Sequence, residues 1–182
     1  MSYFKGVAVL LCILSLCHTR RSHACNGGYK LILHSIENCG GDSQIITIDP
    51  KSTITLMDDC TVKSKSTART TGFKQAMMQV TITKNGLPVL KESVNICASL
   101  KDAANNQDVK EIITMFGVPD RCPVQATEVK TDESQTYNLE KYKNHLLVAQ
   151  GRSIVDVLIT HDKGESCFKF DLEVTAPPNI VG

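Results

Sequence analysis

GRSIVDVLITHDKGESCFKFDLEV, residues 151–174, decides the fold of this chain. In its second half, residues 167–174, apolar side chains alternate with charged ones, which places one set on a buried face and the other in water. The β-branched run 153–160 precedes it, and the polar residues 161–164 lie between the two. The stretch therefore predicts an antiparallel hairpin of two half-buried strands.

The same pattern recurs through the chain as short alternating or β-branched runs bounded by turn residues. The other strands that we expect cover residues 29–37, 45–49, 53–62, 74–83, 89–97, 128–130 and 145–149. Lys84-Asn85-Gly86 predicts a hairpin, because both central positions of a type I′ turn require a positive φ.

One segment has helical spacing. Apolar residues recur at intervals of three and four between Val109 and Phe116, and Gly117 ends the run. A single helix among many strands predicts an all-β fold. We expect an immunoglobulin-like antiparallel β-sandwich of two sheets, with one short helix in a connection and disulfide staples.

The N-terminus has the features of a secretory signal. Lys5 precedes the apolar run 7–17, and Ser22-His23-Ala24 offers small residues for cleavage. The alternative is a membrane anchor, but this run is far shorter than the roughly 20 residues that span a bilayer. We expect a signal peptide at 1–24, a single domain at 25–176, a loose tail at 177–182 and no transmembrane segment. The protein is then secreted, with the lysosomal lumen as a second possible destination.

Cleavage after Ala24 leaves six of the eight cysteines, which in an oxidising compartment predict three disulfides with 15 connectivities open. They are Cys25, Cys39, Cys60, Cys97, Cys122 and Cys167. A metal site is the alternative. No two of these cysteines have the close spacing of zinc ligands, and the three remaining histidines are scattered, so we expect neither a metal nor another cofactor.

Charge excludes other partners. Removing Lys5, Arg20 and Arg21 changes the formal net charge from +1 to about −2, and no basic run occurs elsewhere. Electrostatic binding to nucleic acid or to an anionic membrane is therefore not expected.

Three segments carry a resemblance to a known family. FGVPDRCP (116–123), a polar loop ending in TYNLEKY (136–142) and the stretch 151–174 resemble the C-terminal half of the ganglioside activators and of the wider ML (lipid-recognition) family. IENCGG (36–41), followed by a strand and IDP (48–50), is similar to the start of that family. The likeness covers about 36–174 and is strongest after 112. It implies a sandwich whose sheets splay around a lipid cavity.

Two departures from the family bear on function. The activators carry more cysteines between the helix and Cys-Pro, and their tryptophan-bearing membrane loop has no clear counterpart in this chain. The resemblance therefore favours a secreted carrier or sensor, as in insect-type members, over an activator of a glycolipid hydrolase.

The disulfide pairing follows from the same resemblance. The family joins its first and last cysteines, which by position are Cys39 and Cys167. Cys97 with Cys122 would close a loop around the helix, and the pair Cys25 with Cys60 is what remains.

The resemblance also implies an apolar cavity lining, although ordinary core packing explains each residue as well. The candidates are Phe73, Met77, Val80, Ile82, Ile112, Phe116, Leu147, Val157, Ile159, Phe168 and Phe170. Lys63, Lys65 and Arg69, among serines and threonines, are candidates for binding a head group at the cavity mouth. The alternative for these three is a solvated edge strand guarded by charge.

No motif of a known catalytic site occurs, so we expect no enzyme. The leading hypothesis is a non-enzymatic binding protein that holds a lipid or other hydrophobic molecule between two sheets, as carrier, sensor or presenter. The alternatives are a protein–protein interaction module with a filled core, which would bind a receptor, and an activator that presents glycolipid to a lysosomal hydrolase.

Overall fold

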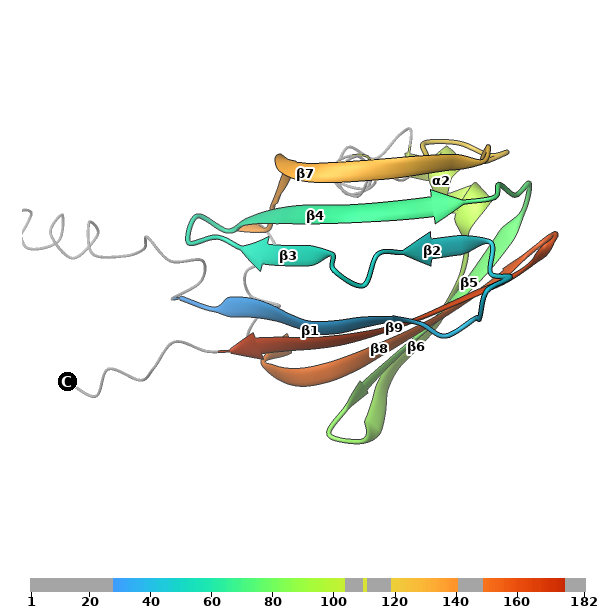
Figure 1. Cartoon of the computed structure of the whole chain (residues 1–182). Coiled ribbons are helices and arrows are strands. Elements are labelled where there is room, and N and C mark those ends of the chain that lie inside the picture. Colours follow the sequence, from blue (N-terminus) through green and yellow to red (C-terminus); the bar gives the residue numbers. More distant parts are fainter. Residues whose placement is uncertain (1–27, 104–109, 111–118, 141–148, 176–182) are drawn as a thin grey trace, which may run out of the picture.

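The computed structural model describes residues 28–103, 110, 119–140 and 149–175, and two antiparallel sheets face each other in this part of the chain (Figure 1). The five-stranded sheet has the order β1 (Lys30–Asn38), β9 (Gly164–Thr175), β8 (Gly151–His161), β5 (Ala76–Lys84) and β6 (Leu87–Asn95). In the four-stranded sheet, β4 (Thr61–Thr70) pairs on one edge with β2 (Ile46–Ile48) and β3 (Thr53–Leu56), and on the other with β7 (Thr127–Asn138). A short helix, α2 (Ile96–Ala103), follows β6. The predicted all-β sandwich is confirmed.

Both predicted hairpins form. β8 and β9 pair continuously from Gly151 opposite Val174 to His161 opposite Gly164. In the turn between β5 and β6, Asn85 and Gly86 have φ values of 52° and 77°, as a type I′ turn requires.

The expected strand over 53–62 is wrong, because it contains a turn. Met57 donates its N–H to Thr61 O and Cys60 donates to Met57 O, so the chain reverses between β3 and β4. Asp59 accepts the N–H of Thr61 at 2.9 Å, and Cys60 has a φ of 65°. Asp58-Asp59 is a turn signal in the sequence, since an Asp side chain accepts hydrogen bonds from nearby backbone N–H groups.

Other predicted boundaries also shift. The expected strand over 89–97 ends at Asn95, whose Oδ1 accepts the N–H of Ala98 and caps α2. The expected strand over 128–130 is only part of β7, which continues through an irregularity near Glu133 to Asn138. The helix expected over 109–116 and the strand over 145–149 fall outside the described residues, apart from Lys110 and Ala149.

The structure contains two of the three predicted disulfides. Cys39–Cys167 ties the end of β1 to β9, and Cys97–Cys122 ties α2 to the segment before β7. Cys60 is also disulfide-bonded, but Cys25 is outside the described residues, so the pair Cys25–Cys60 stays a prediction.

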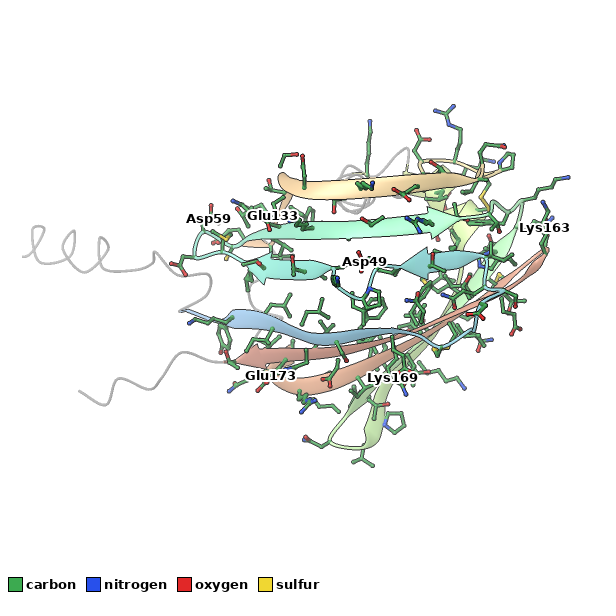
Figure 2. All side chains as sticks on the ribbon, in the orientation of Figure 1. Asp49, Asp59, Glu133, Lys163, Lys169 and Glu173 are labelled. Carbon is green, nitrogen blue, oxygen red and sulfur yellow. A yellow bond between two sulfur atoms is a disulfide. The ribbon has the colours of Figure 1, made fainter. Side chains whose placement is uncertain are left out.

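Two buried clusters close the sandwich at opposite ends, which the turn residues Asp59 and Lys163 mark in Figure 2. The cluster near Asp59 contains Leu56, Cys60, Val62 and Tyr137. The cluster near Lys163 contains Ile45, Phe73, Ala76, Val124, Ile159 and Phe168.

Candidate ligand-binding face between the sheets

The side of the five-stranded sheet that faces the other sheet is mostly apolar. Strand alternation and the register of β1, β9, β8, β5 and β6 decide which side chains share it. Its apolar members are Leu31, Leu33, Ile36, Phe168, Phe170, Leu172, Val174, Val155, Val157, Ile159, Met78, Val80, Ile82, Val94 and Leu90. Lys84, Glu92 and Ser153 lie on the same side, toward the β5–β6 hairpin. We call this surface the inner apolar face.

The inner apolar face is buried at the Lys163 end and partly exposed to solvent toward the β5–β6 hairpin. Near Lys163 its residues are buried, with Ile159 6% and Phe168 3% exposed. Farther along the same sheet Val80 and Val155 are only half-buried, and Leu90 at the edge strand is 41% exposed. The packing of the sandwich thus loosens from the Lys163 end toward the β5–β6 hairpin.

The opposite wall is polar in its middle. Ser64 and Thr131 are buried, and Ser66 is half-buried, on the inner side of β4 and β7. The Thr131 hydroxyl lies 3.0 Å from that of Ser66 and 3.4 Å from that of Ser64, and it accepts the N–H of Ser66 at 2.9 Å. A molecule lying between the sheets would therefore meet aliphatic groups on one side and hydroxyls on the other.

One edge of the sandwich is closed by side-chain hydrogen bonds. Asn38 on β1 donates to Ile48 O at 2.7 Å, and its Oδ1 accepts the N–H of Ile48 at 2.9 Å. Gln44 donates to the same oxygen at 2.9 Å, and its own Oε1 accepts the N–H groups of Gly40 and Cys167. The Asn38 amide thus takes the place of a backbone partner and fixes β2 against β1.

His161 is a buried residue that the sequence reasoning did not single out. Its Nε2 lies 2.9 Å from the Ser166 hydroxyl, which accepts the N–H of Ile46. Its ring packs against that of Phe73, with the ring centroids 4.7 Å apart and the planes tilted by 51°. Burial lowers the pKa of His161, and the charge of Asp162 opposes this effect. Its buried Nδ1 has no hydrogen-bond partner among the described residues, which also favours a neutral ring.

Seven of the predicted lining residues lie between the sheets. Val80, Ile82, Val157 and Phe170 are half-buried, whereas Phe73, Ile159 and Phe168 are buried in the core near Lys163. The sequence could not separate these two groups, because both follow the same strand pattern. Ile112, Phe116 and Leu147 lie outside the described residues.

The placement of Met77 in the lining is wrong. Met77 is 43% exposed on the outer face of β5, and its neighbour Met78 packs against the buried cluster near Lys163 instead. Ala76 is buried at 3% exposure and fixes this register, since successive residues of a strand point to opposite faces.

The predicted basic residues do not lie at the mouth of the inter-sheet space. Lys63, Lys65 and Arg69 alternate with the inward residues of β4 and point outward. Arg69 donates to Glu128 on β7, and hydrogen bonds from Lys130 and Arg69 lower the pKa of Glu128. The edge-strand alternative is also wrong, because β4 is the central strand of its sheet.

The outer face of the five-stranded sheet carries charged side chains beside the exposed hydrophobic residues Ile32, Met77 and Leu158. Figure 2 shows Lys169 and Glu173 on the side of β9 away from the four-stranded sheet. Ion pairs there join Arg152 to Asp171 and Glu173 to His34. The inner side is therefore the extended apolar side of this sheet.

The described part of the chain contains no helix that is long and apolar enough to cross a membrane. No group of three or more potential metal ligands gathers among those residues.

Comparison with known proteins finds a relative over nearly the whole chain. The sequence is 72% identical over 176 residues to sporozoite-associated mosquito saliva protein 1 of Anopheles gambiae, and the match covers 97% of each chain. No family model matches. The crystal structure of chicken MD-1 complexed with lipid IVa matches 78% of this chain and 96% of that one, with 11% identity and a TM-score of 0.38. This likeness is too weak to carry an argument.

Proposed function

We propose that this chain, which belongs to the family of the Anopheles gambiae sporozoite-associated mosquito saliva protein 1, is a salivary carrier of an amphipathic lipid. The chain is a secreted protein, and its disulfides suit an oxidising compartment. The proposed ligand lies between the two sheets, with its hydrocarbon part on the inner apolar face.

The observation that carries this proposal is the half-buried part of the inner apolar face. A filled sandwich would bury Val80, Val155 and Ile82 as deeply as Ile159 and Phe168, but these three remain partly exposed. Moving about ten methylene groups from water onto such a surface would gain about 8 kcal/mol, which corresponds to micromolar binding.

The opposing hydroxyls support a ligand with a polar part. Ser64, Ser66 and Thr131 can exchange hydrogen bonds among themselves for bonds to a ligand hydroxyl or carbonyl, because each hydroxyl both donates and accepts. A purely hydrocarbon ligand would make no use of this wall.

Uptake of a fluorescent fatty acid tests the proposal with a matched pair of variants. Val155→Trp adds bulk on the inner apolar face, whereas Ile154→Trp adds the same bulk on the outer face of β8. We expect Val155→Trp to weaken uptake by about tenfold or more and Ile154→Trp to leave it unchanged. Equal uptake by both variants would contradict binding between the sheets.

Two other functions would give different results. A protein that takes up no lipid would be a protein–protein interaction module with a filled core. An activator would accelerate glycolipid hydrolysis in a reconstituted mixture with a lysosomal hydrolase. An unchanged hydrolysis rate at saturating protein would remove that role.

A further inference from the structure

The tip of the β5–β6 hairpin is the most apolar exposed segment among the described residues. Leu87 is 69% and Val89 60% exposed, the two highest values for large hydrophobic side chains in that part of the chain, and Leu90 is 41% exposed. With Pro88 they form an unbroken apolar run, LPVL, directly after the Asn85-Gly86 turn. Isolated exposed hydrophobics are common, but several of them gathered at one turn indicate an interaction surface.

The tip of the β5–β6 hairpin protrudes from the rest of the described molecule. The turn between β5 and β6 extends away from the four-stranded sheet and lies at the outer end of the hairpin (Figure 1). Its geometry is fixed by the type I′ turn and by the pairing of Lys84 with Leu87. Exposed apolar side chains are thus held at a protruding point of the described molecule.

Pairing with a second copy of this chain along β6 is disfavoured. Pro88 lacks the N–H that a new strand would need, and a register shift interrupts the edge between Ile82 and Thr83 of the neighbouring strand. Lys91, also exposed on β6, adds a charge that opposes pairing with an identical edge.

We propose that this hairpin tip inserts into the surface of a lipid bilayer. The uncharged segment 85–90 is followed by the exposed Lys91, so its side chains can enter the acyl boundary while the Lys91 ammonium group meets lipid phosphates. With a single lysine at the tip, apolar insertion dominates, and binding depends little on salt.

The tip also adjoins the candidate ligand face. Leu90 pairs with Ile82, which belongs to the inner apolar face where that face is half-buried. Docking at the tip would bring this loosely packed side of the sandwich to the membrane. The membrane proposal does not depend on the ligand proposal, since it rests on the exposed tip alone.

Flotation with phosphatidylcholine vesicles tests the insertion, using the disulfide-bonded secreted protein. We expect the wild type to float with the vesicles and the double variant Leu87→Asp/Val89→Asp to lose about tenfold or more of its partitioning. Met57→Asp is the matched control, because Met57 is a 37% exposed hydrophobic in the β3–β4 turn. It should float like the wild type.

Three results would overturn the proposal: a wild type that does not float, a double variant that floats like the wild type, or an equal loss in the Met57 control. Dimerisation that the double variant abolishes would assign the tip to a second copy instead. Leu87→Ser/Val89→Ser replaces the aspartates if these disturb folding, and near-ultraviolet circular dichroism checks each variant. Uptake of a soluble fluorescent fatty acid should stay unchanged in the tip variants, which separates this test from that of the ligand site.

Discussion

At the scale of single residues, buried and half-buried polar side chains determine how the two sheets are held together. Asn38, Gln44, His161 and Ser166 lie where β1, β8 and β9 meet the segment around β2. The sequence pattern did not reveal them, because a buried polar residue is recognised only once its partners are known. Removing the partner of any of them should lower the free energy of unfolding, because a buried polar group then has neither a hydrogen bond nor contact with water.

His161 predicts a dependence of stability on pH. Burial keeps its pKa in the folded state below the unfolded value of about 6.5, so the unfolded state takes up the proton first as the pH falls. The contribution of this residue is complete above about pH 6.5 and is lost progressively below it. Urea unfolding of His161→Gln should show a weaker decline between about pH 7.5 and 5.5 than the wild type. Identical slopes would contradict a buried neutral ring.

Asn38 predicts a specific loss of stability. Asn38→Ala removes the partners of both Ile48 backbone groups and one partner of Gln44, and should lower the free energy of unfolding by about 1–3 kcal/mol. Glu37→Ala, at the exposed neighbouring position, should change it little. A loss in Asn38→Ala no larger than in Glu37→Ala, measured by urea denaturation, would show that these bonds do not hold the edge.

At the scale of elements, local turn chemistry explains which parts of the fold could be predicted. Asn85-Gly86 provides the two positive φ values of a type I′ turn, and the polar residues after His161 separate two strand-like runs, so both hairpins follow from the sequence. β4 escaped prediction because its inward residues are mostly serine and threonine and its outward ones lysine, threonine and arginine, so no apolar alternation marks it. Helix α2 escaped because the apolar residues after Val94 continue the preceding strand pattern.

The candidate site was predicted in part for the same reason. The predicted lining residues of β8 and β9 lie on the inner side, as do Val80 and Ile82 of β5, but Met77 was assigned to the wrong face of that strand. The group of hydroxyls on the four-stranded sheet depends on the pairing of β4 with β7. This pairing brings Ser64 and Ser66 next to Thr131, which is 65 or more residues away in the sequence. No local pattern contains that information.

The two described disulfides should differ in their effect on stability. Cys39–Cys167 joins residues 128 apart and Cys97–Cys122 residues 25 apart, so the first restricts the unfolded chain more. Replacing each pair by alanine should cost about 5 and about 3.5 kcal/mol respectively on the chain-entropy model. Urea denaturation of the two double variants gives the comparison. A larger loss for the Cys97–Cys122 pair would contradict this ranking.

At the scale of the whole molecule, the sandwich is tightly packed at two ends and loose on one side. The buried clusters near Asp59 and Lys163 and the Asn38 hydrogen bonds supply stability, while the sheet toward the β5–β6 hairpin keeps apolar groups accessible. The proposed binding of a hydrophobic ligand depends on this combination of a stable frame and an accessible apolar surface.

Native mass spectrometry of the secreted, oxidised protein, followed by organic extraction, tests most directly whether the protein carries an amphipathic lipid between its sheets. We expect an added mass of one amphipathic lipid per chain, which extraction removes and which the empty protein takes up again. A protein that carries no added mass and takes up no fatty acid, sterol or glycolipid would contradict the carrier function.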